Sequence, residues 1–222
     1  MKGPADVAVE ARLWQLISAA APVGAFHFSE GLETAVEVGW VTDGESLERW
    51  LRGQLHHSLA RLDLALILRV MDVWRARDLK AVLHWNVVAD ACRETREVRE
   101  QHRHMGHALG RLARALGEPF PDAPLNYAPA FALMAENRCV EGTRAIGGYA
   151  FAWCENQVVG AQKLLSLGQL AAQGVLAQVS TGLDGVVATA AACDDTSIGM
   201  GIPCVTLASM RHETQYSRLF RS

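Results

Sequence analysis

The sequence predicts an all-α protein: a single-domain helical bundle around a long buried central helix, followed by an interaction-prone C-terminal tail. Three observations predict this fold. Apolar residues recur every three or four positions through most of the 222 residues. Capping residues and glycines separate these periodic segments. Residues 164–183 carry no charge, so this part of the chain is expected inside the bundle.

The central helix is expected over residues 148–180, where Glu155 and Lys163 are the only charged residues. On a helical wheel the polar residues of this segment share one narrow stripe, opposite the leucines. The stripe consists of Glu155, Gln162, Ser166, Gln169, Gln173 and Ser180. Neutral amides indicate a face covered by another helix, a second subunit or a narrow wet cavity. Because these amides would lose water in a bilayer, a membrane span is not expected.

The remaining helices follow from caps and apolar spacing. In the first half they are expected over residues 8–20, after Ser29 as far as Gly39, from a capping box at 42–45 through 59, from Asp63 through 74, and from Asp78 to 116 with one interruption. The proline-rich stretch 117–124 is expected as a loop. A helix through residues 131–134, an entry to the central helix at Gly147-Gly148, and a helix over 184–193 complete the bundle.

Composition excludes several classes of protein. The formal net charge of −3 gives no reason to expect nucleic-acid or membrane-surface binding. No lysine follows a glycine-rich loop, so the chain is not a P-loop NTPase, and no GxSxG or HExxH motif indicates another catalytic site. The five cysteines form no CxxC pair, which indicates reduced core thiols in the cytoplasm. Glu10 and Arg12 precede any apolar core, so no signal peptide is expected.

Two charged or histidine-rich strings are candidates for function. Arg93, Glu94, Arg96 and Glu97 lie in the string CRETREVRE, where Arg93–Glu97 and Arg96–Glu100 are expected as i,i+4 pairs on a solvated helix face or an interface. Downstream, His104 and His107 are i,i+3 neighbours and weak candidate metal ligands for Ni²⁺ or Zn²⁺. His102 points away from both, so a solvated basic face is the alternative.

The C-terminal segment is unusual because it combines aromatic and basic residues. Tyr216, Leu219 and Phe220 have i,i+3,i+4 spacing among Arg211, Arg218 and Arg221. Such residues are enriched at protein interfaces. The tail 209–222 is therefore expected either to dock on its own domain or, as we prefer, to become ordered when a partner binds. Lys163 has no nearby carboxylate and is expected either at the surface or against a tertiary or partner acid.

Several stretches resemble UreF-type urease accessory proteins. They are the PVGAF and SEGLE strings at 22–33, GWV at 39–41, ACRETRE at 91–97, the central segment around Tyr149 to Gln169, and the C-terminal string ASMRHETQYSRLFRS. His27-Phe28 and Glu30 depart from the residues usual in that family. The likeness covers the chain from about residue 13 to its end.

The resemblance implies an all-α, dimeric, cytoplasmic protein. It would bind a UreD/UreH-type accessory protein, recruit the UreG-type GTPase and help to deliver nickel to apo-urease, with no cofactor of its own. It would be a non-catalytic scaffold; regulation of the GTPase stays open. The tail is expected to contact the UreD/UreH-type partner through Arg211, His212, Glu213, Gln215, Tyr216, Arg218, Leu219, Phe220 and Arg221. Glu155, Lys163, Arg93, Glu94, Arg96 and Glu97 are candidates for the GTPase-facing or subunit surface. The alternative is a nickel metallochaperone that binds Ni²⁺ through its histidines.

Overall fold

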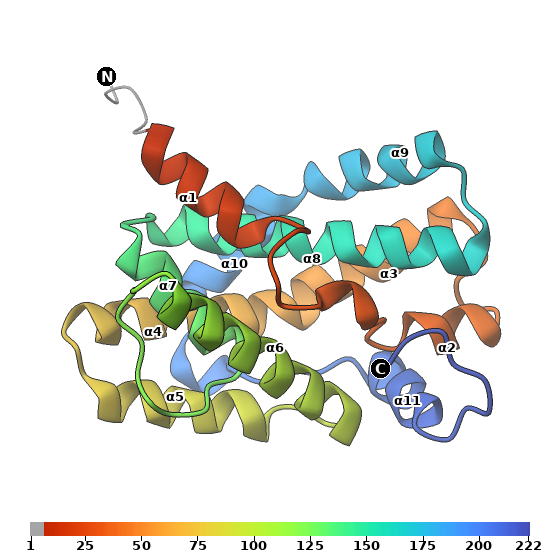
Figure 1. Ribbon diagram of the computed structural model, residues 1–222. Helices are drawn as coiled ribbons and strands as arrows, with labels where there is room; N and C mark the ends of the chain where they lie inside the picture. Colours follow the sequence, from red (N-terminus) through yellow and green to blue (C-terminus); the bar gives the residue numbers. More distant parts are fainter. Residues whose placement is uncertain (1–6) are drawn as a thin grey trace.

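The computed structural model describes residues 7–222, and within them the all-α prediction is confirmed, because no strand is present (Figure 1). Residues 1–6, which begin the segment judged not to be a signal peptide, lie outside the described part. The helices are α1 (Val7–Ile17), α2 (Leu32–Glu37), α3 (Gly44–His57), α4 (Asp63–Arg75), α5 (Leu79–Ala91), α6 (Arg96–Ala115), α7 (Tyr127–Asn137), α8 (Gly142–Leu165), α9 (Gln169–Ser180), α10 (Leu183–Ala192) and α11 (Pro203–His212).

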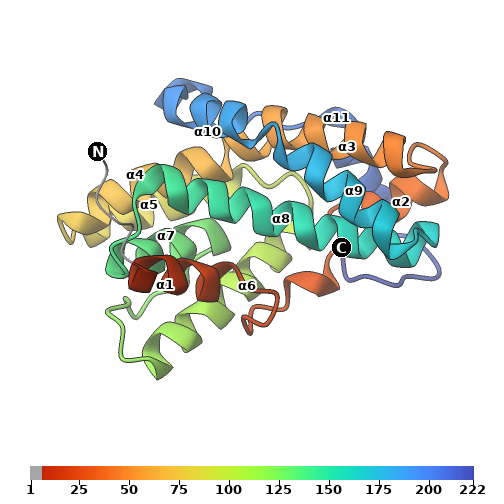
Figure 2. The same cartoon turned by 90° about the horizontal axis from the view of Figure 1, so that it is seen from above.

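The core is centred on α7 and α8. Helix α7 packs between α4 and α6, and its residues 128–135 are all buried, including Phe131. Helix α8 crosses the molecule and contacts α1, α2, α4, α9 and α10 (Figure 2). The helix buried along most of its length is thus α7, whose residues 128–135 are all apolar, without a polar stripe.

The prediction of one continuous helix over 148–180 is wrong. Helix α8 ends at Leu165, Ser166 adopts a left-handed conformation (φ 52°), and α9 runs back along α8 as an antiparallel hairpin (Figure 1). The amide stripe is therefore divided between two helices, and Gln169 and Gln173 are exposed on α9. These amides do not line a wet cavity inside the chain.

Several caps differ from the prediction by a few residues. Asp43 rather than Thr42 caps α3, and Ser46 completes the capping box. Asp78 caps α5 as predicted, accepting a hydrogen bond from the Ala81 amide at 3.0 Å. Helix α8 begins at Gly142, five residues before the expected entry, because the Glu141 side chain caps it. Sequence reasoning missed α11, although Pro203 at its first turn is a typical start signal.

The cysteines were expected as thiols in the core. The five cysteines are not all core thiols: Cys154 and Cys193 are buried, Cys92 is half-buried, and Cys139 and Cys204 are exposed.

Among residues 7–222, no single helix has the length and apolar character to cross a membrane. Helices α9 and α10 together meet that test by length and composition alone, with a 41° bend between them.

Gly106 sets the distance between α6 and the start of α7. A Cβ at this position would overlap the Leu125 carbonyl oxygen and approach the Asn126 carbonyl carbon to 2.6 Å. Both obstacles are backbone atoms, which cannot move aside as a side chain would. Residue 106 must therefore be glycine for α6 and α7 to pack this closely.

Gly106→Ala should lower the free energy of unfolding by about 2–3 kcal/mol, because the helices must separate to admit the methyl group. Urea unfolding followed by circular dichroism measures the change. The matched control is Gly53→Ala in α3, where a Cβ meets no atom within 4 Å. That substitution should instead stabilise the helix by about 0.5–1 kcal/mol. Equal effects of the two substitutions would contradict the packing argument.

Candidate interaction site

Three segments that are far apart in the sequence meet at one end of the molecule. They are the loop 22–31 with α2, the break between α5 and α6 at 92–95, and α11 with the residues after it. Residues 209–212 of the predicted tail belong to α11, so the tail in the structure is residues 213–222. The tail is not helical, and it lies beside α2 and α11 (Figure 1). The tail therefore docks on its own chain, which is the first of the two alternatives left open by the sequence.

Glu33 on α2 holds the tail backbone. Its two carboxylate oxygens accept hydrogen bonds from the amides of Leu219 (2.7 Å) and Phe220 (2.9 Å). The next amide, that of Arg221, donates to the His27 carbonyl oxygen at 2.8 Å. Three successive amides thus have partners, so residues 219–221 need no helix of their own.

The last residue is also held. The Ser222 carbonyl oxygen accepts hydrogen bonds from the Ser29 amide (2.6 Å) and the Ser29 hydroxyl (2.5 Å). The Ser222 hydroxyl donates to Gln101 Oε1 at 2.6 Å. Phe220 is buried nearby, and Lys163 Nζ lies 5.6 Å from the centre of its ring. Lys163 is exposed and meets an aromatic face rather than a tertiary acid, while Glu155 is half-buried on α8.

His212 links α2 to α6 beneath the tail. Its side chain is fully buried, with Nδ1 at 2.7 Å from Glu97 Oε2 and Nε2 at 3.3 Å from Glu33 Oε2. Arg218 Nη1 lies 2.6 Å from the other oxygen of Glu97. His212 thus bridges two carboxylates on different helices, and Arg218 adds a second contact to Glu97, so the C-terminal segment also ties α2 to α6.

The tail presents apolar groups to solvent as well as to the core. Tyr216 is fully exposed, and Leu219 is 61% exposed, whereas Phe220 turns inward. The interpretation of these three residues as one helical face is therefore wrong. Arg211, Arg218 and Arg221 are exposed around Tyr216 and Leu219. The tail therefore presents exposed aromatic and arginine side chains on a backbone held by hydrogen bonds, and these residue types are enriched at protein interfaces.

Two further tail residues make contacts within the chain. Glu213 Oε1 accepts hydrogen bonds from the amides of Arg96 (3.1 Å) and Glu97 (3.3 Å), at the N-terminus of α6. Gln215 Oε1 accepts a hydrogen bond from the Thr34 hydroxyl at 3.3 Å. Both side chains therefore serve the docking of the tail.

Helix α11 and the tail pack against the CRETREVRE string, so this string is not a uniformly solvated face. The predicted Arg93–Glu97 pair is not formed, because Arg93 precedes α6 and turns inward to Asp63. Glu94 accepts a hydrogen bond from Thr206 on α11, and the carboxylate of Glu97 contacts His212 and Arg218. The Arg96–Glu100 pair is confirmed at 3.7 Å and is exposed.

Behind the string lies a cluster of buried ionisable groups. Burial raises the pKa of Asp63, but the charge of Arg93, the nearby His102 and the hydrogen bonds from Arg93 and Tyr149 together outweigh burial, so the pKa lies below its usual range. Burial and the nearby Arg93 charge lower the pKa of His102 to about 3. His102 Nδ1 lies 3.9 Å from Asp63 Oδ1, and the Tyr149 hydroxyl donates to the same oxygen at 3.4 Å. His102 is therefore a neutral core residue, not part of a solvated basic face.

Glu30 connects this cluster to the tail. It has a left-handed backbone (φ 51°) and accepts hydrogen bonds from Trp153 Nε1 (2.8 Å) and Gln101 Nε2 (2.5 Å). Burial raises its pKa. A cavity of about 30 Å³, room for one water molecule, lies between Glu30, His102 and Trp153. Because Gln101 also binds Ser222, a continuous chain of hydrogen bonds joins the tail to the core.

The histidines do not converge on one point. His104 and His107 are exposed on α6, whereas His102 faces the core. Among residues 7–222, no group of three or more His, Cys, Asp or Glu side chains could hold a metal ion. The geometry therefore gives the carrier alternative, in which all three histidines bind nickel, no support.

The fold and this site describe an all-α protein whose distinctive surface is a docked, aromatic and basic C-terminal tail. The family model described as UreF matches residues 41–180. The urease accessory protein UreF of Alkalilimnicola ehrlichii is 44% identical over 216 residues, which covers 95% of each chain. The UreF of Chromohalobacter salexigens is 45% identical over 217 residues, covering 96% of this chain and 94% of that protein. The chain belongs to the UreF family of urease accessory proteins.

Removing one oxygen acceptor from Glu33 should release the tail. In Glu33→Gln one of the two tail amides faces an NH₂ group, so the docked state loses a charge-assisted hydrogen bond, worth about 1.5–3 kcal/mol. Trypsin cleavage after Arg218 should then be about tenfold faster or more, because cleavage tracks the population of the open tail. Glu37→Gln, on the exposed end of α2, is the matched control. Equal cleavage rates in the two variants would show that Glu33 does not hold the tail.

His102 should make the protein sensitive to acid. Its folded-state pKa of about 3 is below the ordinary 6.5, so the unfolded chain binds a proton first and stability falls as the pH drops below 6.5. Between pH 7.5 and 5 this group alone should cost about 2 kcal/mol. His102→Gln should lose that share of the pH dependence in urea unfolding, whereas exposed His104→Gln should keep it. An undiminished pH dependence in His102→Gln would refute this assignment.

Proposed function

We propose that this chain is the bridging subunit of a urease-activation complex in the cytoplasm. It binds a UreD/UreH-type accessory protein and recruits a UreG-type GTPase, and the assembly delivers nickel to apo-urease. The chain couples GTP turnover to metal transfer without hydrolysing GTP or holding a cofactor itself. Membership of the UreF family supports the accessory role, and the surface of the tail supports the contact with the UreD/UreH-type partner.

The observation that carries the proposal is the exposure of Tyr216 and Leu219 on a backbone held by Glu33. A preorganised backbone lowers the entropy lost on binding, so exposed anchors on it favour association. Leu207 and Met210 on α11 are also exposed and extend the apolar surface beside the tail. Arg211 and Arg221 provide charged hydrogen-bond donors around it.

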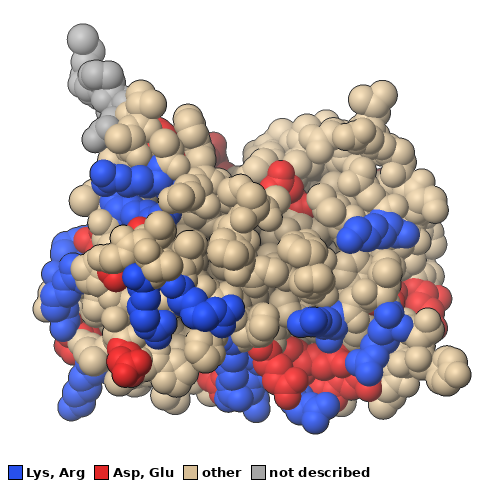
Figure 3. Space-filling model, viewed as in Figure 1, with Lys and Arg blue, Asp and Glu red and all other residues tan. Residues whose placement is uncertain are grey.

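A second copy of the chain is proposed on the outer face of α9. That face has Leu170, 90% exposed, together with exposed Gln169, Gln173 and Ala177, and carries no charge. In Figure 3 the upper part of the molecule, over α8 and α9, is largely free of charged groups, whereas charges crowd the lower part. An uncharged surface with an exposed leucine is typical of an interface between subunits.

Tyr216→Ala combined with Leu219→Ala should weaken binding of the UreD/UreH-type partner by about thirtyfold or more, the usual effect of removing central anchors. Co-purification and titration of the two proteins measure the loss. Because both side chains are exposed, the circular dichroism spectrum should not change.

Trp14→Ala on α1 is the control, since it removes a large exposed aromatic residue from another surface. Undiminished binding by the tail variant would exclude the tail from the interface. Light scattering of the wild-type complex gives its mass, and a mass with one copy of this chain would rule out the proposed dimer.

A further inference from the structure

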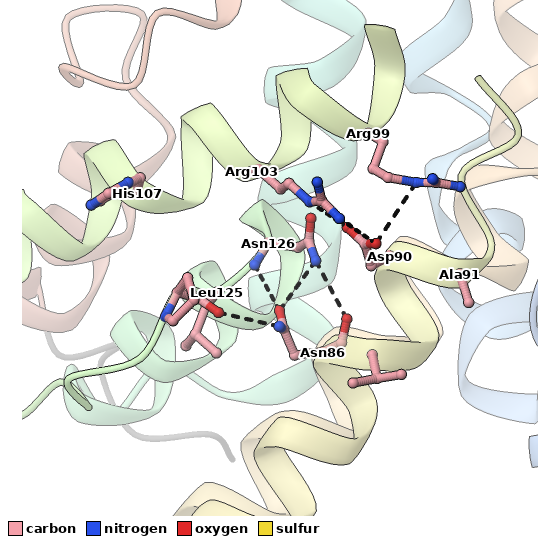
Figure 4. Close-up of a pocket in the computed structure, with 10 residues that line it drawn as sticks. Asn86, Asp90, Ala91, Arg99, Arg103, His107, Leu125 and Asn126 are labelled. Carbon is pink, nitrogen blue, oxygen red and sulfur yellow. Dashed lines mark hydrogen bonds and ion pairs between the residues drawn. The ribbon is translucent and has the colours of Figure 1, made fainter. Parts of the chain in front are cut away.

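A groove of about 710 Å³ lies between α5 and α6, and none of its lining residues belongs to the tail (Figure 4). The loop that precedes α7 closes its base through Leu125 and Asn126. Asn86 on α5 fixes this loop, because its Oδ1 accepts from the Asn126 amide (2.7 Å) and its Nδ2 donates to the Pro124 carbonyl (3.2 Å). The base of the groove is therefore preformed.

On the α5 side, Val87 and Ala91 line the groove together with Asn86 and Asp90, and Val87 is the end of an exposed apolar ridge on α5. Leu79, Leu83 and Val87 follow one another at intervals of four residues and are all exposed, Val87 by 66%. Four-residue spacing places them along one side of the helix, so they form a ridge rather than scattered apolar positions. The ridge spans most of α5, about two helical turns or some 12 Å between its first and last residue.

The α6 side is basic. Arg99, Arg103 and His107 also recur at intervals of four and line the groove. Asp90 on α5 pairs with both arginines: Arg103 donates to its two oxygens at 2.7 Å each, and Arg99 Nε lies 3.7 Å from Oδ2. Burial raises the pKa of Asp90, but these arginines outweigh it and lower the pKa, so the carboxylate is charged. One negative charge faces two positive charges, which leaves the groove positive.

Two polar groups in the groove, on Arg103 and Asn126, lack a hydrogen-bond partner among residues 7–222. Arg103 binds Asp90 through Nε and Nη2 only, so Nη1 is available to a further acceptor. The Asn126 side chain is 97% buried, and its Oδ1 accepts no hydrogen bond from any described residue. In Figure 4 this oxygen points up toward Arg103, into the groove. A buried acceptor without a donor is costly unless something binds there.

We propose that the groove between α5 and α6 binds an acidic, amphipathic helical segment of a partner protein. Carboxylates of that segment pair with Arg99 and Arg103, and its aliphatic side chains cover Leu83 and Val87. The combination decides the class of partner. A small anion or a nucleic-acid phosphate would pair with the arginines but would leave the apolar ridge on α5 uncovered. A helix with one apolar and one acidic side matches both walls.

The test uses a fluorescein-labelled peptide of 13 residues, the length of α5, with leucine at every third or fourth position and glutamate elsewhere. A matched peptide has lysine in place of glutamate. Fluorescence anisotropy with the full chain in low salt should detect binding of the acidic peptide only. Arg103→Glu and Val87→Asp should each weaken binding about tenfold or more, since each removes one wall of the site.

Arg111→Glu is the matched control, because Arg111 is exposed on the same helix but does not line the groove. It should change the affinity less than about twofold if the contact is local. Equal binding of the two peptides, no binding at about millimolar chain concentration, or equal losses in Arg103→Glu and Arg111→Glu would each overturn the proposal. All three variants alter exposed positions, and an unchanged unfolding transition verifies that they fold.

Discussion

The buried ion pair between Asp63 and Arg93 is the contact on which the end of the molecule that carries the tail depends. Arg93 lies in the short break between α5 and α6, and Asp63 begins α4, so the pair fixes where α6 starts. From that start Glu97 reaches His212 and Arg218. Removing either partner would leave an unpaired buried charge, which typically costs several kcal/mol. The position of the tail thus follows from a contact in the core that the tail does not touch.

Local signals in the sequence were sufficient for most of the helices. Asp78 marked the start of α5, and the break before α6 was expected. The hairpin between α8 and α9 was not predictable, because serine is not a residue type that favours the left-handed conformation of Ser166. The absence of charge did not help either, since an uncharged segment is equally consistent with burial in the core and with an interface to a partner. The docked course of the tail was not the preferred prediction, because its residue spacing is local information, whereas the acceptors of its amides, Glu33 and His27, lie about 190 residues earlier.

Sequence reasoning named some residues of the candidate site but not their contacts, and it did not name Glu33, Ser29 or Gln101 as site residues, although they hold the tail. Arg93, Glu94 and Glu97 were singled out for their charge, yet each makes its contact inside the chain, with Asp63, Thr206 and His212 respectively. Charge density alone cannot distinguish a solvent-exposed helix face from a surface on which another segment of the chain packs, because both contain the same residue types. The groove between α5 and α6 escaped sequence reasoning for a related reason: its two walls belong to different helices, and only the fold brings their periodic stripes together.

The bonds between the tail and α2 have a consequence for how the protein is made. Glu33 and Ser29 emerge early from the ribosome, whereas Leu219 and Ser222, which bind them, are 186 and 193 residues further along the chain. Closing so long a loop is slow compared with forming the local helices. Glu33 therefore has no tail amides to bind until residues 219 and 220 have been synthesised, and this end of the molecule is assembled late, when its exposed apolar groups most need protection from aggregation.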